Sequence, residues 1–108
     1  MKALTKNDDL MKTARMKAKD MVDNNYCAHK SPTYGSPSQM VKKYAKGVAY
    51  GGENIASGQK TAETAVTAWK NSDTHRAIML KKNINCVGIG VAANSKGVLV
   101  WSLIVGTK

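Results

Sequence analysis

Residues 98–105 read Val-Leu-Val-Trp-Ser-Leu-Ile-Val and are apolar throughout except for Ser102. A strand without a polar face is buried on both sides, so the sheet that contains it needs helices over each face. The preceding residues 86–92 alternate bulky and small side chains, and residues 94–97, Asn-Ser-Lys-Gly, form a turn signal. We therefore expect an α+β fold, a three-layer α-β-α sandwich that ends in an antiparallel hairpin.

Helical patterns occupy four stretches upstream of this hairpin. The first helix is expected to begin at Thr5 and to end near residues 24–25. Its apolar side recurs at helical spacing and consists of Leu10, Ala14, Ala18, Met21 and Val22. The second begins at Ser36, where Ser, Pro and Gln take the positions of a capping box with proline in the first turn. The third begins at Thr61, and a short fourth helix covers residues 75–82.

The size and composition of the chain indicate one globular domain, residues 1–108. The chain has 108 residues, 43% of them hydrophobic, which is enough to build a core and excludes intrinsic disorder. No stretch approaches the roughly 18 apolar residues that a bilayer-spanning helix needs. The first residues show no signal-peptide pattern. We expect either a cytosolic protein or a domain excised from a longer one.

The charge of the chain is strongly positive. Seventeen Lys and Arg residues face seven Asp and Glu, a formal net charge of +10. This balance favours anionic surroundings such as a cell-wall polymer or a membrane surface, although a solvated lysine-rich surface is the simpler interpretation. The basic residues are scattered and no basic segment carries interleaved aromatic residues, so nucleic acid is not expected as a partner.

Three titratable residues are conspicuous in the sequence. Glu53 follows two glycines at 51–52, where the backbone holds its carboxylate in place. His75 stands near the start of a helix, where the helix dipole disfavours the imidazolium form, and His29 lies in a loop upstream. Two histidines and a carboxylate can hold Zn²⁺ with one coordination position open, or act as acid–base partners. The alternative is that all three only organise loops through hydrogen bonds.

Three motifs carry a family resemblance. They are Ala-His-Lys-Ser-Pro-Thr-Tyr-Gly at 28–35, Gly-Gly-Glu-Asn-Ile-Ala-Ser-Gly at 51–58, and Ala-Trp-Lys-Asn-Ser-Asp-Thr-His-Arg-Ala-Ile-Met-Leu at 68–80. In their order and intervals they resemble the bacterial branch of the CAP superfamily (cysteine-rich secretory proteins, antigen 5, pathogenesis-related 1), also called SCP-like domains. The resemblance runs from about Leu4 to the C-terminus and implies the same α-β-α sandwich.

The resemblance also implies a cleft lined by two histidines and, in eukaryotic members, two glutamates. His29 and His75 match the histidines, and Glu53 matches the glutamate of the Gly-Glu-Asn motif. Ser72 stands where the second glutamate is expected, so the tetrad is incomplete, which weakens the transfer of metal binding or hydrolysis. The family's usual helix before Leu4 is missing, which indicates a truncated or excised domain.

The two cysteines do not match the cysteines of the eukaryotic members. In the family fold the exit of the first helix and the strand that begins at Cys86 would be neighbours, so we expect a disulfide between Cys27 and Cys86. Such a bond would contribute roughly 4 kcal/mol in the chain-entropy model. The alternatives are a nucleophilic Cys27 assisted by His29, or two inert buried thiols.

The function implied first is a non-catalytic, secreted or cell-surface binding module, as most family members are secreted. Its cleft of His29, Glu53, Ser72 and His75 would take a peptide, glycan or lipid, or an anionic wall polymer. The alternative is a Zn²⁺-dependent hydrolase or peptidase, with His29 and His75 as ligands and Glu53 as base or third ligand. Zn²⁺ is the one cofactor considered. A third hypothesis gives the trio a structural role only.

Overall fold

The computed structural model describes residues 5–71 and 84–108, which form an α+β fold. In chain order the elements are β1 (Thr5–Lys6), α1 (Asp8–Asp23), α2 (Pro37–Tyr44), β2 (Ala49–Ser57), α3 (Ala62–Lys70), β3 (Cys86–Ala93) and β4 (Leu99–Thr107). The strands make one mixed sheet in the order β1-β3-β4-β2, in which β1 is parallel to β3 and the other pairs are antiparallel. None of the described helices is long and apolar enough to span a bilayer. The helix expected over 75–82 lies outside the described residues.

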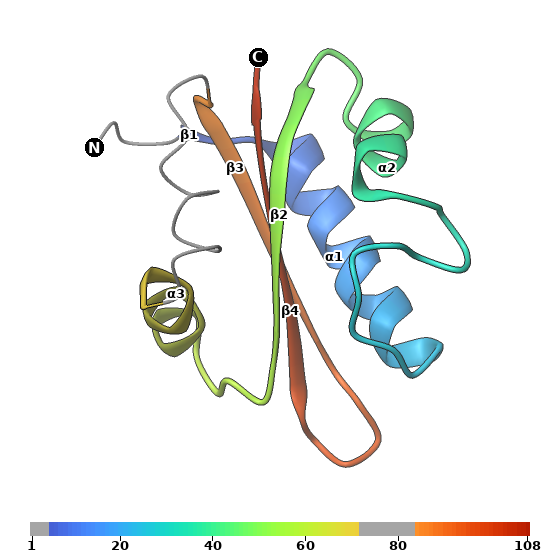
Figure 1. Cartoon of the computed structure of the whole chain (residues 1–108), viewed down its shortest axis with the longest axis vertical. Coiled ribbons are helices and arrows are strands. Elements are labelled where there is room, and N and C mark those ends of the chain that lie inside the picture. The colour runs from blue at the N-terminus through green and yellow to red at the C-terminus, as the bar shows by residue number, and fades with distance from the viewer. Residues whose placement is uncertain (1–4, 72–83) are drawn as a thin grey trace.

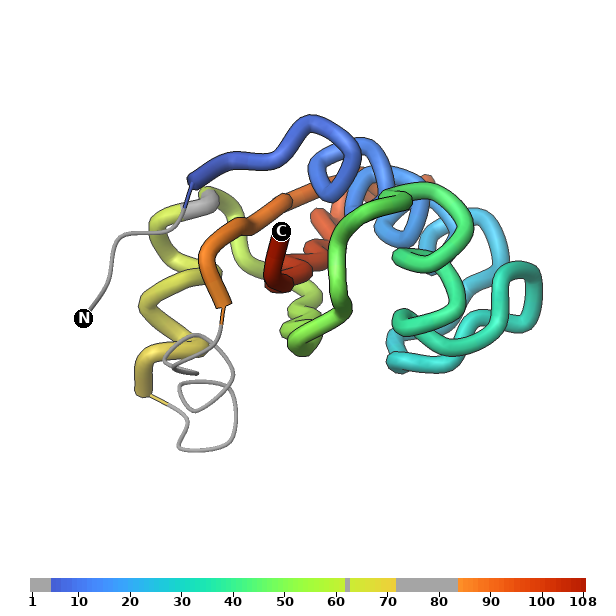
Figure 2. The backbone as a smooth tube through the Cα atoms, turned by 90° about the horizontal axis from the view of Figure 1, so that it is seen from above, coloured from blue at the N-terminus to red at the C-terminus, as the bar shows by residue number. Residues whose placement is uncertain are grey.

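The described helices lie on both faces of this sheet (Figure 1), and the view from above separates them clearly (Figure 2). One core cluster joins α1 and α2 to Ile104 of β4. The other joins α3 to Trp101, Leu103 and Val105 of the same strand. Successive side chains of a strand point to opposite faces, so β4 supplies both cores at once. This is the two-sided burial that the apolar stretch 98–105 predicted.

Two local predictions are confirmed by hydrogen bonds. In the turn between β3 and β4, Asn94 Oδ1 accepts from the backbone N–H groups of Lys96 at 2.9 Å and Val98 at 3.0 Å. At the start of α2, Ser36 N–H donates to Gln39 Oε1 at 2.8 Å and Gln39 N–H donates to Ser36 Oγ at 3.2 Å. The capping box and the hairpin turn therefore form as their residue types indicate.

The small residues of β3 let α1 approach the sheet closely. A Cβ added at Gly88 would overlap the helix backbone at residues 10–11, and one added at Gly90 would overlap it at residues 14–15. Only glycine leaves room for this contact. The small residues in the alternation over 86–92 thus form the surface on which α1 packs.

The first helix begins later than predicted. Thr5 belongs to β1 and pairs with Cys86, and its N–H donates to the carbonyl of Asn85 at 3.0 Å. The N-cap is Asn7, whose Oδ1 accepts from the N–H of Leu10 at 2.9 Å. Thr5 is drawn into the sheet because a β-branched residue fits a strand, and asparagine is an equally good cap.

The strand that carries Glu53, β2, was not expected from the sequence. It pairs antiparallel with β4, and its register shifts around Gly51, which marks a β-bulge. A Cβ at Gly51 would lie only 2.6 Å from Ile84 Cγ2, so glycine is required there. The glycine pair was expected to let the backbone hold the Glu53 carboxylate, and it does so through a bulge in a strand, which sets the direction of the Glu53 side chain.

Candidate functional site

Glu53 is held beneath the surface by β2. It pairs with Ile104 of β4, so its side chain shares the face on which Ile104 packs against α1 and α2. The carboxylate has no solvent exposure. Ser102 of β4 donates a hydrogen bond from Oγ to Glu53 Oε2 at 2.9 Å. A carboxylate buried in this way also needs a compensating positive charge nearby.

That charge comes from Lys17 of α1, whose side chain is buried completely. Its Nζ lies 3.2 Å from Oε1 and 3.4 Å from Oε2 of Glu53, and it donates a hydrogen bond to the backbone carbonyl of His29. An ammonium group has three N–H donors, and the Lys17 ammonium has three oxygens within reach, two from Glu53 and one from the His29 carbonyl. Lys17 was not expected at the site, although it follows Ala14 by three residues and precedes Met21 by four, and so lies on the apolar stripe of α1.

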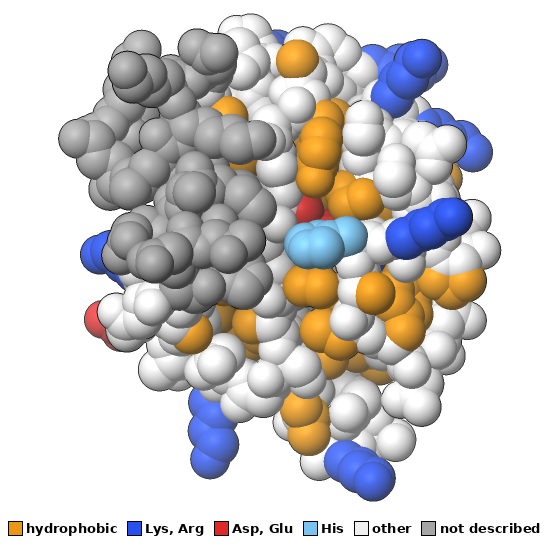
Figure 3. All heavy atoms as spheres, in the orientation of Figure 1, with side chains coloured by type: hydrophobic (Ala, Val, Ile, Leu, Met, Phe, Trp, Pro, Cys, Tyr) orange, Lys and Arg blue, Asp and Glu red, His pale blue; other side chains and the backbone are white. Residues whose placement is uncertain are grey.

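His29 covers the buried pair from the loop between α1 and α2. Its Nδ1 lies 2.9 Å from Glu53 Oε1, and 55% of its side chain is exposed. It is the one histidine among the described residues and appears in pale blue on the surface, with hydrophobic side chains above and below it (Figure 3). An ionised carboxylate only accepts hydrogen bonds, so Nδ1 is the donor, and in the neutral form of the ring the acceptor lone pair lies on Nε2.

The loop that carries His29 is anchored by Asp20, near the end of α1. The Asp20 carboxylate accepts hydrogen bonds from the hydroxyl groups of Tyr26 and Ser31, and from Asn24 Nδ2 at 2.7 Å. Burial raises the pKa of the Asp20 carboxyl, but these hydrogen bonds together outweigh burial and hold the pKa below its ordinary value. The loop is therefore fixed on both sides of the histidine.

The structure brings together two of the four residues expected to line the cleft. His29 and Glu53, 24 positions apart, are in direct contact. Ser72 and His75 lie outside the described residues. Lys17 and Ser102 complete the network from α1 and β4 and were not anticipated.

Of the residues that the resemblance implies around Zn²⁺, the structure describes His29 and Glu53, whereas His75 lies outside the described residues. Over 5–71 and 84–108, no three His, Cys, Asp or Glu side chains are grouped so that they could hold a metal ion. Glu53 is engaged by the Lys17 ammonium on both oxygens. A divalent cation at either oxygen would meet that positive charge in a dry environment, where repulsion is strong.

The expected disulfide is not formed, because Cys27 and Cys86 are both free thiols. Cys86 opens β3 beside β1, at the N-terminal end of α1, whereas Cys27 follows the C-terminal end of that helix. A helix of 16 residues spans about 24 Å at 1.5 Å per residue. A disulfide needs Cα atoms within roughly 7 Å of each other. The length of α1 therefore separates the two cysteines.

Cys27 also lacks the properties of an activated nucleophile. Burial raises the pKa of its thiol, and the negative charge of Glu53 adds to this, while the positive charge of Lys17 opposes it. The net direction is upward, so the reactive thiolate is a minor form at neutral pH.

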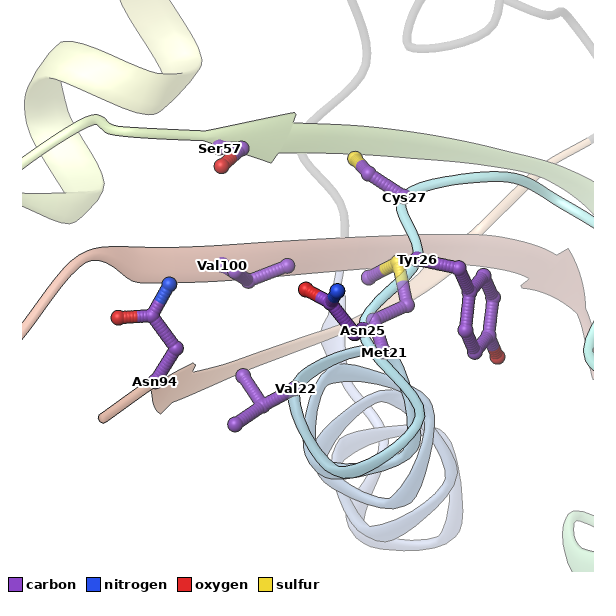
Figure 4. Close-up of a pocket in the computed structure, with 8 residues that line it drawn as sticks. All are labelled: Met21, Val22, Asn25, Tyr26, Cys27, Ser57, Asn94 and Val100. Atoms are coloured by element: carbon purple, nitrogen blue, oxygen red, sulfur yellow. The ribbon is translucent and has the colours of Figure 1, made fainter. Parts of the chain in front are cut away.

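A pocket of about 220 Å³ lies beside Cys27, where α1 ends (Figure 4). Met21 and Val100 supply apolar surface, and Ser57 and Asn94 supply polar groups. None of the residues that line it is an acid or a base of the Asp, Glu, Lys, Arg or His type. The surface that lines the pocket is more polar than apolar, so the pocket suits an uncharged polar group.

Comparison with known protein families and sequences gives consistent matches. A family model described as "CAP: Cysteine-rich secretory protein family" matches residues 1–105. The chain is 48% identical over 102 residues to the uncharacterized protein YkwD of Bacillus subtilis (strain 168), a match that covers 94% of this chain and 38% of YkwD. It is 35% identical over 74 residues to the uncharacterized membrane protein YlbC of the same organism, covering 68% of this chain and 21% of YlbC. The chain thus spans well under half the length of these relatives.

Two solved structures are similar over the whole chain. An outer surface protein from Borrelia burgdorferi has a TM-score of 0.87 at 22% identity, with 80% of that chain covered, and this is a likeness of fold alone. An extracellular protein containing a SCP domain from Bacillus anthracis str. Ames has a TM-score of 0.83 at 29% identity, with 35% of that chain covered.

Proposed function

Because the chain belongs to the cysteine-rich secretory protein (CAP) family, we propose that it is a secreted or cell-surface binding module that does not catalyse a reaction. In this proposal a peptide, glycan or lipid docks in a cleft on an α-β-α sandwich. The residues of the cleft are His29, Glu53, Ser72 and His75. His29 makes the direct contact, and Glu53 holds it in place.

The observation that carries this proposal is the engagement of Glu53. Its two oxygens accept from Lys17, His29 and Ser102, and its side chain has no solvent exposure. A general base needs a lone pair within reach of water or substrate, and a metal ligand needs one directed at the metal. The closed network offers neither, so the geometry favours recognition over the alternative of a Zn²⁺-dependent hydrolase.

The chemistry of the ligand follows from His29 and from the pocket at Cys27, two positions earlier in the same loop. His29 offers the acceptor Nε2, so the ligand presents a hydroxyl or amide N–H to it. The pocket at Cys27 has no charged lining residue and a volume of about 220 Å³, which suits a small neutral group. Glycans and peptides carry both kinds of group, and we therefore place them ahead of lipids.

A location outside the cell is supported by two features. The similar SCP-domain protein from Bacillus anthracis is extracellular by its description, and the similar Borrelia burgdorferi protein is described as an outer surface protein. The net charge of +10 attracts the chain to anionic wall polymers. In this proposal the charge brings the domain to the polymer and the cleft selects the ligand.

The test is a titration of ¹⁵N-labelled protein with soluble peptidoglycan fragments, which carry both sugar and peptide groups. The proposal predicts saturable shifts of the loop amides around His29. The affinity should fall by about tenfold or more in His29→Ala, because this change removes one good hydrogen bond to the ligand. Lys19→Met, which removes an exposed charge on the outer side of α1, should bind like the wild type. Equal affinity in His29→Ala would remove the cleft from the proposal.

A further inference from the structure

Lys17 departs from an ordinary rule of folding, because it is a lysine without solvent exposure. Lysine is almost never fully buried unless it is paired, and an ammonium is costly to remove from water. Lys17 is nevertheless completely buried and packed between α1 and the sheet. A methionine or leucine at this position of the apolar stripe would pack in the core without burying a charge. The charge itself is therefore the feature that needs an explanation.

The ammonium lies beside both carboxylate oxygens of Glu53, which the alternative function would use to hold a metal ion. Its Nζ is within 3.4 Å of both oxygens of Glu53 and donates to the carbonyl of His29. Zn²⁺ bound to a carboxylate lies about 2.0–2.2 Å from the oxygen. An ion at that distance from Glu53 would be in the immediate neighbourhood of Nζ, with no solvent between the two cations to screen them.

We infer that Lys17 is the resident cation of the cleft: it supplies the positive charge that Glu53 requires and excludes divalent metal ions from it. Lys17 is a positioning residue, because it acts through Glu53 and the His29 carbonyl and does not reach the surface. It fixes the His29 backbone directly and the imidazole through Glu53. The inference concerns the cation of the site and stands independently of which ligand the cleft binds.

Calorimetric titration with ZnCl₂ tests this inference on the intact chain. Wild type should show no Glu53-dependent binding. Lys17→Met should bind Zn²⁺ at least about tenfold more tightly than wild type, on the scale by which neighbours of a metal ligand change its affinity. Glu53→Gln in the Lys17→Met background should abolish the gain. Lys19→Met is the matched control, since Lys19 lies on the same helix, exposed and paired with Asp23 at 2.6 Å.

Two further measurements keep the inference open to refutation if Lys17→Met does not fold. Lys17→Gln keeps an N–H donor for the His29 carbonyl without the charge, and it should show the same gain in Zn²⁺ affinity. In wild type, tight Zn²⁺ binding that Glu53→Gln abolishes would overturn the inference, and so would unchanged affinity in both Lys17 variants. If wild type binds neither peptidoglycan fragments nor Zn²⁺, and the Lys17 variants gain Zn²⁺ affinity as expected, the proposed ligand is wrong but the inference about Lys17 holds.

Discussion

Removal of the Lys17 side-chain charge is the most informative change to the stability of this domain. In Lys17→Met the apolar stem is kept, but the carboxylate of Glu53 stays buried without its counter-ion. Breaking a buried ion pair from one side costs about 3–5 kcal/mol. A domain of this size has a free energy of unfolding of roughly 5–15 kcal/mol, so we expect Lys17→Met to lose about a fifth of it or more.

Glu53→Gln should be comparably destabilising, because it leaves the ammonium without its carboxylate. In the double variant neither charge remains. We therefore expect the double variant to lose about 2 kcal/mol less than the sum of the two single changes, a coupling typical of residues in one network.

Urea unfolding, followed through the buried Trp69 and Trp101, measures all four proteins of this cycle. Lys19→Met should unfold at the same urea concentration as wild type, since its ion pair with Asp23 is exposed. A loss below about 1 kcal/mol in Lys17→Met, or single changes that add within about 0.5 kcal/mol, would show that the buried pair does not stabilise the cleft.

Three other predictions follow from the fold and the loop. Gly90→Ala should lower the free energy of unfolding in urea by at least about 2 kcal/mol, because the added Cβ overlaps the α1 backbone. Val91→Ala, at an exposed site, should change it little. Equal urea midpoints for Gly90→Ala and wild type would refute the close packing of α1 on β3. The pKa of the Asp20 carboxyl is lower in the folded protein than its ordinary value of 3.8, so the ionised carboxylate stabilises the fold above pH 3.8, and this contribution is lost as the pH falls through the pKa of the folded protein. The difference in melting temperature between Asp20→Asn and wild type should therefore shrink below pH 3.8. A difference that stays constant with pH would exclude this linkage. Cys27 should react with a thiol reagent in the folded protein and Cys86 only after unfolding, and absence of free thiol in mass spectrometry would instead indicate the disulfide.

Elements governed by neighbouring residues were predictable from the sequence. The hairpin follows from the alternation over 86–92 and the apolar run 98–105, and the α2 cap follows from Ser36 and Gln39, because each signal acts within a few positions. The two-sided burial of β4 was equally readable, since a strand without a polar face leaves no alternative.

Features that depend on distant partners were not predictable in this way. β2 was missed because glycines weaken the local signal of a strand, while the bulge exists only through pairing with β4. The first helix was begun too early because Thr5 pairs with a strand that follows some eighty residues later. The disulfide was wrong because the sequence does not show that Cys27 and Cys86 lie at opposite ends of α1.

The candidate site was predicted only in part, for a similar reason. His29 and Glu53 were paired through the family resemblance, since their spacing alone carries no geometric information. Lys17 was overlooked because a lysine in a helix is usually solvated, and its place on the apolar stripe was not weighed against that rule. A charged residue at an apolar position of an amphipathic helix is the signal that would have found it.

The central claim is that Lys17, Glu53 and His29 form a closed network that presents His29 without a metal ion. The most direct test is the ¹⁵N spectrum of the His29 imidazole near neutral pH, recorded before and after addition of equimolar Zn²⁺, with His75→Gln used to assign the signals. The account predicts a proton on Nδ1, a lone pair on Nε2, and the same spectrum with Zn²⁺. A proton on Nε2, or a change with Zn²⁺ that disappears in Glu53→Gln, would contradict it.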